Sequence, residues 1–185
     1  MPDLIERWCS GDSDAFEALF RQYEKLVFRT AYLIVGDVEK ARDVMQEVFV
    51  SVWKSRHTFN PEKGKFTTWL HRITVNKCSK KQGRYRPVFL SLEETQEKGF
   101  QPESNDDLPE ELIISREEYN ELMKALSALD TKYRSVVVLR YFSELSCEEI
   151  AQVEDIPLGT VKSRLHYALK SLRMIYARKS EGYGL

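Results

Sequence analysis

The sequence predicts an all-α protein of two small helical domains joined by an acidic, flexible linker. Apolar residues recur at steps of three and four in several segments, and no run alternates β-branched with polar residues between turn signals. An acidic stretch without helical periodicity interrupts these patterns near the middle of the chain. The 185 residues are 42% hydrophobic, which suits small cores rather than one large one. We place the domains at residues 1–89 and 109–185 and the linker at 90–108.

Two amphipathic helices are predicted first. Asp12 or Ser13 can cap a helix whose apolar positions continue to Gly36, a residue typical of helix ends. Asp37 can cap the next helix, which stops near Phe59, before a turn rich in Asn, Pro and Gly.

The third predicted helix, from about Phe66 to Lys81, is unusually basic. Between Lys63 and Arg86 the chain carries eight basic residues and no acid, with aromatic residues interleaved. Such a stretch attracts polyanions, so nucleic-acid contact and a solvated helix face are both open interpretations. We expect Trp69 to belong to the core rather than to a stacking surface.

The linker has the opposite charge. Residues 91–118 hold 2 basic and 10 acidic residues, whereas residues 1–90 hold 16 and 11. Fully extended, the linker could span up to roughly 60 Å, so the two domains need not touch.

The C-terminal domain begins with two predicted helices. The apolar positions of the first extend from Leu112 to Leu129, and those of the second lie in 131–142, after a cap at Asp130.

A short helix, a tight turn and a long helix follow. Ser146 and Glu149 fit a capping box, residues 155–159 form the turn, and Thr160 is expected to cap a final helix that ends near Arg178. These proportions are typical of a helix-turn-helix, whose second helix enters the DNA major groove; an ordinary amphipathic helix is the alternative. The polar side of the final helix carries Lys162, Ser163, His166, Tyr167, Lys170 and Arg173.

The second helix carries an acidic face. Asp43, Gln46 and Glu47 are spaced to lie together, but the Glu-x-x-His pattern of dinuclear metal sites is missing because Val50 follows at that offset. A solvated face and a docking surface for a partner both fit this pattern.

Several classes of protein are disfavoured. Cys9, Cys78 and Cys147 include no CxxC pair, and no catalytic motif or Gly-rich phosphate loop is present. No run approaches the roughly 18 apolar residues of a membrane span, and the first residues do not resemble a signal peptide. We expect a cytoplasmic protein that is not an enzyme, holds no cofactor or metal, and does not insert into a membrane.

Two blocks of motifs carry a family resemblance. The first consists of Asp14-Ala15-Phe16, 43–49 and 66–70 with Ile73 and Asn76; the second consists of Tyr133-Arg134, 139–141, Leu145-Ser146, 149–151 and 156–165. In this order, and over nearly the whole chain, they resemble the bacterial RNA polymerase sigma factors of the extracytoplasmic-function (ECF) group, through the second and fourth conserved regions of that family.

The resemblance implies a transcription initiation factor that binds core RNA polymerase, recognises the −10 and −35 promoter elements and assists strand opening. It also implies a regulatory anti-sigma partner. The residues that it implies for polymerase binding are Asp43, Gln46, Glu47 and Phe49. Those for the proximal element are Lys63, Lys65, Phe66, Arg72, Asn76, Lys77, Lys80 and Lys81, and those for the distal element are Thr160, Lys162, Ser163, Arg164, His166, Tyr167 and Lys170.

The final helix departs from the usual family pattern in one segment. The segment Tyr167-Ala168-Leu169 stands where relatives often have Arg-Ala-Arg, which removes two cations from the reading helix.

The alternative function is an autonomous helix-turn-helix regulator, although such regulators are usually dimers and this chain shows no dimerisation heptads.

Overall fold

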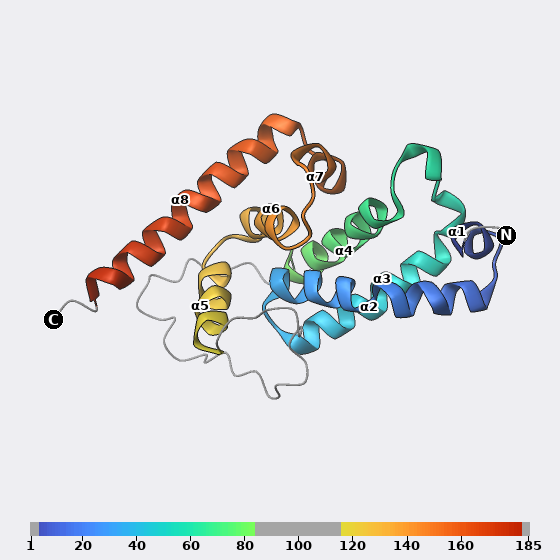
Figure 1. Cartoon of the computed structure of the whole chain (residues 1–185), viewed down its shortest axis with the longest axis horizontal. Coiled ribbons are helices and arrows are strands. Elements are labelled where there is room, and N and C mark those ends of the chain that lie inside the picture. The colour runs from blue at the N-terminus through green and yellow to red at the C-terminus, as the bar shows by residue number, and fades with distance from the viewer. Residues whose placement is uncertain (1–3, 84–115, 183–185) are drawn as a thin grey trace.

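The computed structural model describes residues 4–83 and 116–182, and within these ranges it is helical with no strand, which confirms the all-α class. The N-terminal unit contains α1 (Leu4–Cys9), α2 (Ser13–Val35), α3 (Val38–Lys54), the 3-10 turns η1 (Arg56–Thr58) and η2 (Pro61–Lys63), and α4 (Phe66–Gly83). The C-terminal unit contains α5 (Arg116–Ser127), α6 (Thr131–Tyr141), α7 (Cys147–Glu154) and α8 (Leu158–Gly182) (Figure 1). The expected linker at 90–108 lies outside the described residues.

Local capping explains where the long helices of the N-terminal unit begin and end. The Asp12 carboxylate accepts hydrogen bonds from the backbone N–H groups of Asp14 and Ala15, at 2.9 and 3.1 Å. Gly36 ends α2 in the left-handed conformation, with φ of 73°. Asp37 then caps α3 by accepting from Lys40 N–H at 2.9 Å. The sequence-based boundaries of α2 and the start of α3 are confirmed.

The short helix α1 was not expected from the sequence, although it supplies a central core residue. Trp8 is fully buried, and its ring centroid lies 5.4 Å from that of Phe66 and 5.7 Å from that of Trp69. A six-residue helix is too short to show a periodic apolar pattern, so only the tryptophan itself could have indicated that this segment packs.

The capping box of α7 is confirmed. Ser146 Oγ accepts from Glu149 N–H at 3.1 Å, while the Glu149 carboxylate accepts from Ser146 N–H at 2.9 Å. The expected cap of the final helix at Thr160 is wrong, because α8 already begins at Leu158 and Thr160 N–H donates to Pro157 O. Asp130 does occupy the cap position of α6, but its side chain makes no capping bond.

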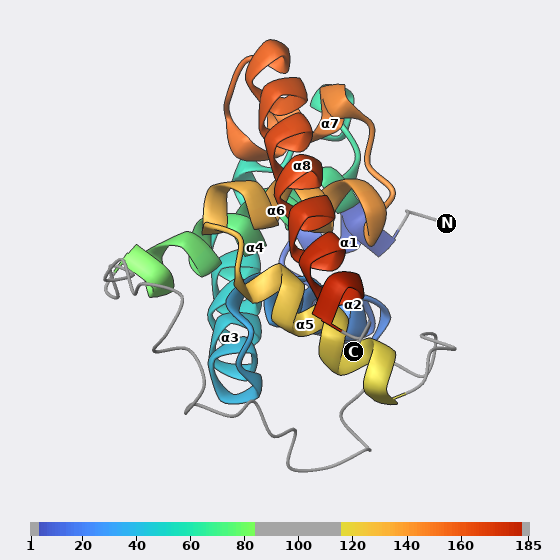
Figure 2. The ribbon, with the colours of Figure 1, turned by 90° about the vertical axis from the view of Figure 1, so that its left-hand side faces the viewer.

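The two units pack against each other in one continuous core, whereas the sequence suggested separate small cores. Helix α6 lies between α8 of its own unit and α2 and α4 of the other (Figures 1 and 2). Six consecutive residues, Arg134–Leu139, are buried. Because successive helical residues point in directions about 100° apart, burial of six in a row requires cover on every side.

Arg134 joins the units through a buried guanidinium. One terminal nitrogen donates to Ile34 O, near the end of α2, at 2.7 Å. The other donates to Ser127 O at 2.8 Å and to Leu129 O at 2.9 Å. Burial lowers the pKa of Arg134 to about 10, so the group stays charged at neutral pH and interacts favourably with the negative end of the α2 dipole.

We predict an acid-sensitive contribution to stability from His71 of α4, which is 1% exposed. Burial lowers its pKa to about 4 from the ordinary value of 6.5, and the nearby Glu149 opposes this shift only in part. The unfolded chain therefore binds the proton more readily than the folded protein. The stabilisation is complete above pH 6.5 and is lost as the pH falls toward 4, by roughly 3 kcal/mol in total.

Urea unfolding between pH 7.5 and 4.5 measures this effect. A His71→Gln variant should show a shallower loss of unfolding free energy with falling pH than the wild type. His57→Gln serves as control, because His57 is exposed on η1. Parallel pH profiles of the wild type and His71→Gln would contradict the prediction.

Candidate nucleic-acid interface

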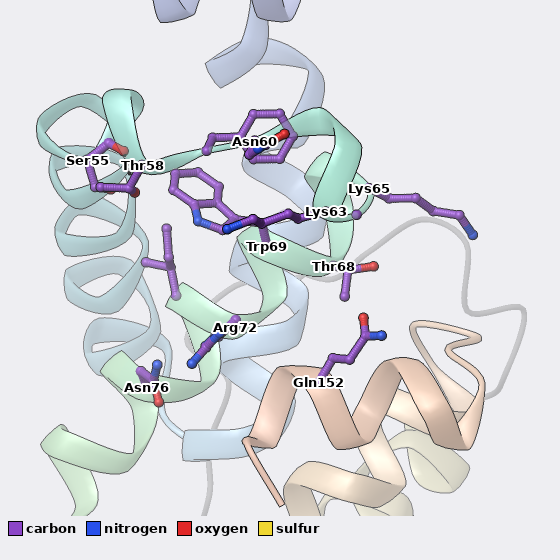
Figure 3. A pocket seen from close by; sticks show the side chains of 13 residues that line it. Ser55, Thr58, Asn60, Lys63, Lys65, Thr68, Trp69, Arg72, Asn76 and Gln152 are labelled. Carbon is purple, nitrogen blue, oxygen red and sulfur yellow. Dashed lines mark hydrogen bonds between the residues drawn. The ribbon is translucent and has the colours of Figure 1, made fainter.

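A pocket of about 480 Å³ opens beside the start of α4, between the turns η1 and η2 and the helix. Figure 3 shows its polar side chains, which come from these turns, from α4 and from α7 of the other unit. Asn60 fixes the turn at its rim, since its side-chain oxygen accepts from Glu62 N–H at 2.8 Å. The lining residues are Ser55, Thr58, Phe59, Asn60, Lys63, Gly64, Lys65, Thr68, Trp69, Arg72, Ile73, Asn76 and Gln152.

A cluster of aromatic rings supports the pocket from beneath. The Phe66 ring lies 5.5 Å from that of Phe59 and 5.2 Å from that of Tyr23, and its residue is only 6% exposed. Phe66 therefore holds α4 on the core, which corrects the expectation that it contacts DNA. The Trp69 ring packs against that of Trp8, as expected of a core residue, and the residue also lines the pocket.

The basic side chains of this region divide into two groups. Lys63, Lys65, Arg72 and Lys80 are exposed, as is Asn76, and all but Lys80 line the pocket. Lys77 and Lys81 instead turn toward α3, where they form ion pairs with Glu47 at 3.5 Å and with Asp43. A surface that combines exposed cations, amides and an aromatic ring suits an unpaired nucleic-acid strand.

The acidic face of α3 lies next to this basic surface. Asp43, Gln46 and Glu47 are exposed together, on the side of α3 away from the core. Phe49 is 5% exposed, and its ring centroid lies 4.6 Å from that of Phe20. Its side chain packs α3 onto α2 and is not part of the exposed face, which corrects the contact inferred from the resemblance.

The polar side of α8 is exposed as expected for a reading helix. Val161, Leu165 and Ala168 are buried against the rest of the unit, which turns the opposite side of α8 outward. The exposed candidates are Lys162, Ser163, His166, Tyr167 and Lys170.

Two candidates on α8 are differently placed. Arg164 forms an ion pair with Glu154 at 3.2 Å, and its side chain is 22% exposed. It therefore ties α8 to the end of α7 rather than facing outward with the others. Thr160, in the first turn of α8, is half-buried, and its carbonyl accepts from Ser163 Oγ at 3.0 Å.

Residues outside the sequence-based set also line the pocket. Ser55, Thr58 and Gln152 carried no motif, and Gln152 reaches the pocket only because the two units pack together. Among the described residues, no group of His, Cys, Asp or Glu could hold a metal ion, and no helix is long and apolar enough to cross a membrane.

Two family models match the chain, one in each unit. Sigma-70 region 2 matches residues 19–85, and Sigma-70 region 4 matches residues 119–172. The first segment contains the acidic face and every pocket-lining residue except Gln152, and the second contains α7 and the first part of α8.

Similar proteins agree with these matches. The chain is 34% identical over 177 residues to the ECF RNA polymerase sigma factor SigW of Bacillus subtilis, covering 91% of this chain and 92% of the relative. It is 34% identical over 179 residues to the ECF RNA polymerase sigma-E factor of Escherichia coli K12, covering 91% and 90%.

Two solved structures share the fold. CnrH, in complex with the cytosolic domain of CnrY, matches with a TM-score of 0.69 at 24% identity, covering 95% of this chain and 96% of that one. The sigma factor RpoE of Bartonella quintana, in complex with the anti-sigma factor NepR, matches with a TM-score of 0.60 at 19% identity, covering 88% and 96%. With both family regions present in order and relatives aligned over nine-tenths of their length, this chain belongs to the ECF group of RNA polymerase sigma factors.

Proposed function

We propose that this sigma factor binds core RNA polymerase through the acidic face of α3, formed by Asp43, Gln46 and Glu47, and reads promoters through two separate surfaces. The α4 pocket takes the proximal −10 element, and α8 takes the distal −35 element. We assign these tasks to domains at 1–89 and 109–185, joined by the linker at 90–108. The observation that carries the proposal is the presence, in one chain, of a pocket of about 480 Å³ flanked by cations and of a separate helix-turn-helix.

The α4 pocket suits a base that has left the duplex. The side-chain amides of Asn60 and Asn76 offer both donors and acceptors, which can pair with the hydrogen-bonding edge that an unpaired base exposes. Trp69 offers an apolar ring, and Lys63 and Arg72 attract the neighbouring phosphates. Binding an extruded base favours the open state of the promoter over the closed state, which assists melting.

The exposed side of α8 suits duplex DNA. Lys162 and Lys170 can contact phosphates, while Ser163 and His166 can hydrogen-bond base edges. Tyr167, which is 58% exposed, replaces a cation of the usual family pattern and offers instead a ring and a hydroxyl group. We therefore propose a distal-element preference that depends less on charge at this position than in relatives.

We further propose that the protein makes and breaks no bonds itself and acts in the cytoplasm, where polymerase and promoters are found. Its binding energy selects the promoter, and polymerase carries out catalysis. A protein inhibitor is a natural partner, because the similar structures of CnrH and RpoE are complexes with CnrY and with the anti-sigma factor NepR.

Removing the acidic face should abolish polymerase binding without unfolding the protein. We predict that an Asp43→Ala, Glu47→Ala double variant loses co-migration with core polymerase and run-off transcription. Its unfolding free energy should change by less than about 1 kcal/mol, since the ion pairs with Lys81 and Lys77 are partly exposed.

The matched control is Glu6→Ala, Glu17→Ala, which removes the same charge from exposed positions of α1 and α2. It should retain transcription. Retention of polymerase binding by the Asp43, Glu47 variant would refute the docking assignment. Tight binding of the protein alone to duplex DNA at physiological salt would instead favour an autonomous regulator.

Neutralising α8 should weaken promoter binding in a salt-dependent way. We predict that Lys162→Ala, Lys170→Ala reduces the slope of log affinity of the holoenzyme for promoter duplex against log salt concentration by about 2, because two phosphate contacts are lost. Titrations between low and physiological salt measure the slope. Lys124→Ala, Lys132→Ala, on exposed positions of α5 and α6, is the control, and an equal reduction there would contradict the assignment.

A further inference from the structure

The first half of α8 exposes no guanidinium group. Arg164 is the only arginine among residues 158–170, and its ion pair with Glu154 turns it toward α7. The exposed cations of this half are Lys162 and Lys170, which the proposed function assigns to phosphates. A basic side chain that bonds both N7 and O6 of guanine is the commonest specific contact in the major groove, and arginine suits it best. The reading helix of this protein therefore depends on other groups for its specificity.

Ser163 presents an acceptor to DNA rather than a donor. Its Oγ donates to Thr160 O, which lies 3.0 Å away in the same helix. Because the hydroxyl hydrogen is engaged there, the lone pairs of Oγ are what remains for a base. An acceptor matches the amino group of adenine or of cytosine and does not match N7 or O6 of guanine.

Tyr167 places an aromatic ring on the same side of α8, which runs along the outer edge of the molecule in Figure 1. It follows Ser163 by four positions and precedes Lys170 by three, so the three side chains are neighbours on the helix surface. Tyr167 is 58% exposed. The His166 ring meets it nearly edge to face, with centroids 5.8 Å apart and planes at 77°. This contact restricts the directions in which the exposed tyrosine ring can turn.

Thymine carries the most apolar group in the major groove, its C5 methyl. Cytosine has only a hydrogen atom at this place, and the purines present polar N7 atoms. An exposed ring that covers a methyl group removes apolar surface of both from water, which is favourable. A ring beside an acceptor, with no guanidinium nearby, therefore matches an A·T pair better than a G·C pair.

We propose that Tyr167 determines specificity in this protein by recognising thymine in the distal promoter element, through contact of its ring with the C5 methyl group. The proposal rests on the assignment of α8 to that element. An arginine at this position would favour guanine, so the exchange of a cation for a ring changes the preferred base pair from G·C to A·T. The distal element of this protein accordingly carries a thymine that faces Tyr167.

Selection with the holoenzyme supplies the probe for this contact. Core polymerase that carries the full-length protein selects promoter duplexes from a pool in which the proximal and distal segments are both random. Each thymine of the selected distal segment is then replaced singly by uracil, which pairs with adenine in the same way and lacks only the methyl group. At one position the replacement should weaken holoenzyme binding about fourfold, as expected for one buried carbon group.

Variants at position 167 identify the ring as the cause. Tyr167→Phe keeps the ring and should retain the fourfold difference between the thymine and uracil duplexes, whereas Tyr167→Ala should bind both duplexes equally. In a new selection, Tyr167→Arg should replace the A·T pair at that position by a G·C pair. Because the side chain is exposed, none of these substitutions disturbs the core.

Tyr141→Ala is the matched control, since Tyr141 is 55% exposed but lies on α6, outside the reading helix. It should keep the fourfold difference. The thymine contact is overturned if no uracil replacement weakens binding, if the difference persists in Tyr167→Ala, or if it is lost in Tyr167→Phe or Tyr141→Ala. In each of these cases a selected distal sequence still supports the proposed function. A selection that enriches no distal sequence overturns the assignment of α8 and the thymine contact together.

Discussion

The burial of α6 is the interaction on which the arrangement of the molecule depends. Its apolar residues face both units at once, so the helix cannot be covered by its own unit alone. A guanidinium can be buried there because carbonyls of both units accept its hydrogen bonds. The two terminal nitrogens of Arg134 find their acceptors in different units, which makes the contact between the units specific as well as apolar.

The charges of the N-terminal unit are divided between neighbouring helices. Helix α3 presents carboxylates and α4 presents cations, and two ion pairs cross between them. These pairs draw Lys77 and Lys81 away from the pocket, so the cations nearest to it are Lys63, Lys65 and Arg72. Protein and nucleic-acid partners can therefore occupy adjacent faces of one small helical unit without competing for the same side chains.

Local signals in the sequence predicted most of the helices and the exposed parts of the site. Caps such as Asp12 and the Ser146 box act within a few residues, so they can be recognised from spacing alone. The packing of the two units against each other could not be predicted, because periodicity identifies an apolar face but not the element that covers it. The run of valines makes α6 apolar on more than one side, and this was the available sign that the helix packs against a second unit. Phe49 and Phe66 were misplaced because a motif records that a residue matters without saying whether it faces outward.

The bond from Arg134 to Ile34 O has a consequence for how the contact can change over evolution. The acceptor is a backbone carbonyl, which every residue type supplies, so the side chain at position 34 can vary without removing it. Only the donor residue and the place where α2 ends must be kept. An interface specified in this way tolerates sequence drift on one side while remaining sensitive to insertions and deletions that shift the end of that helix.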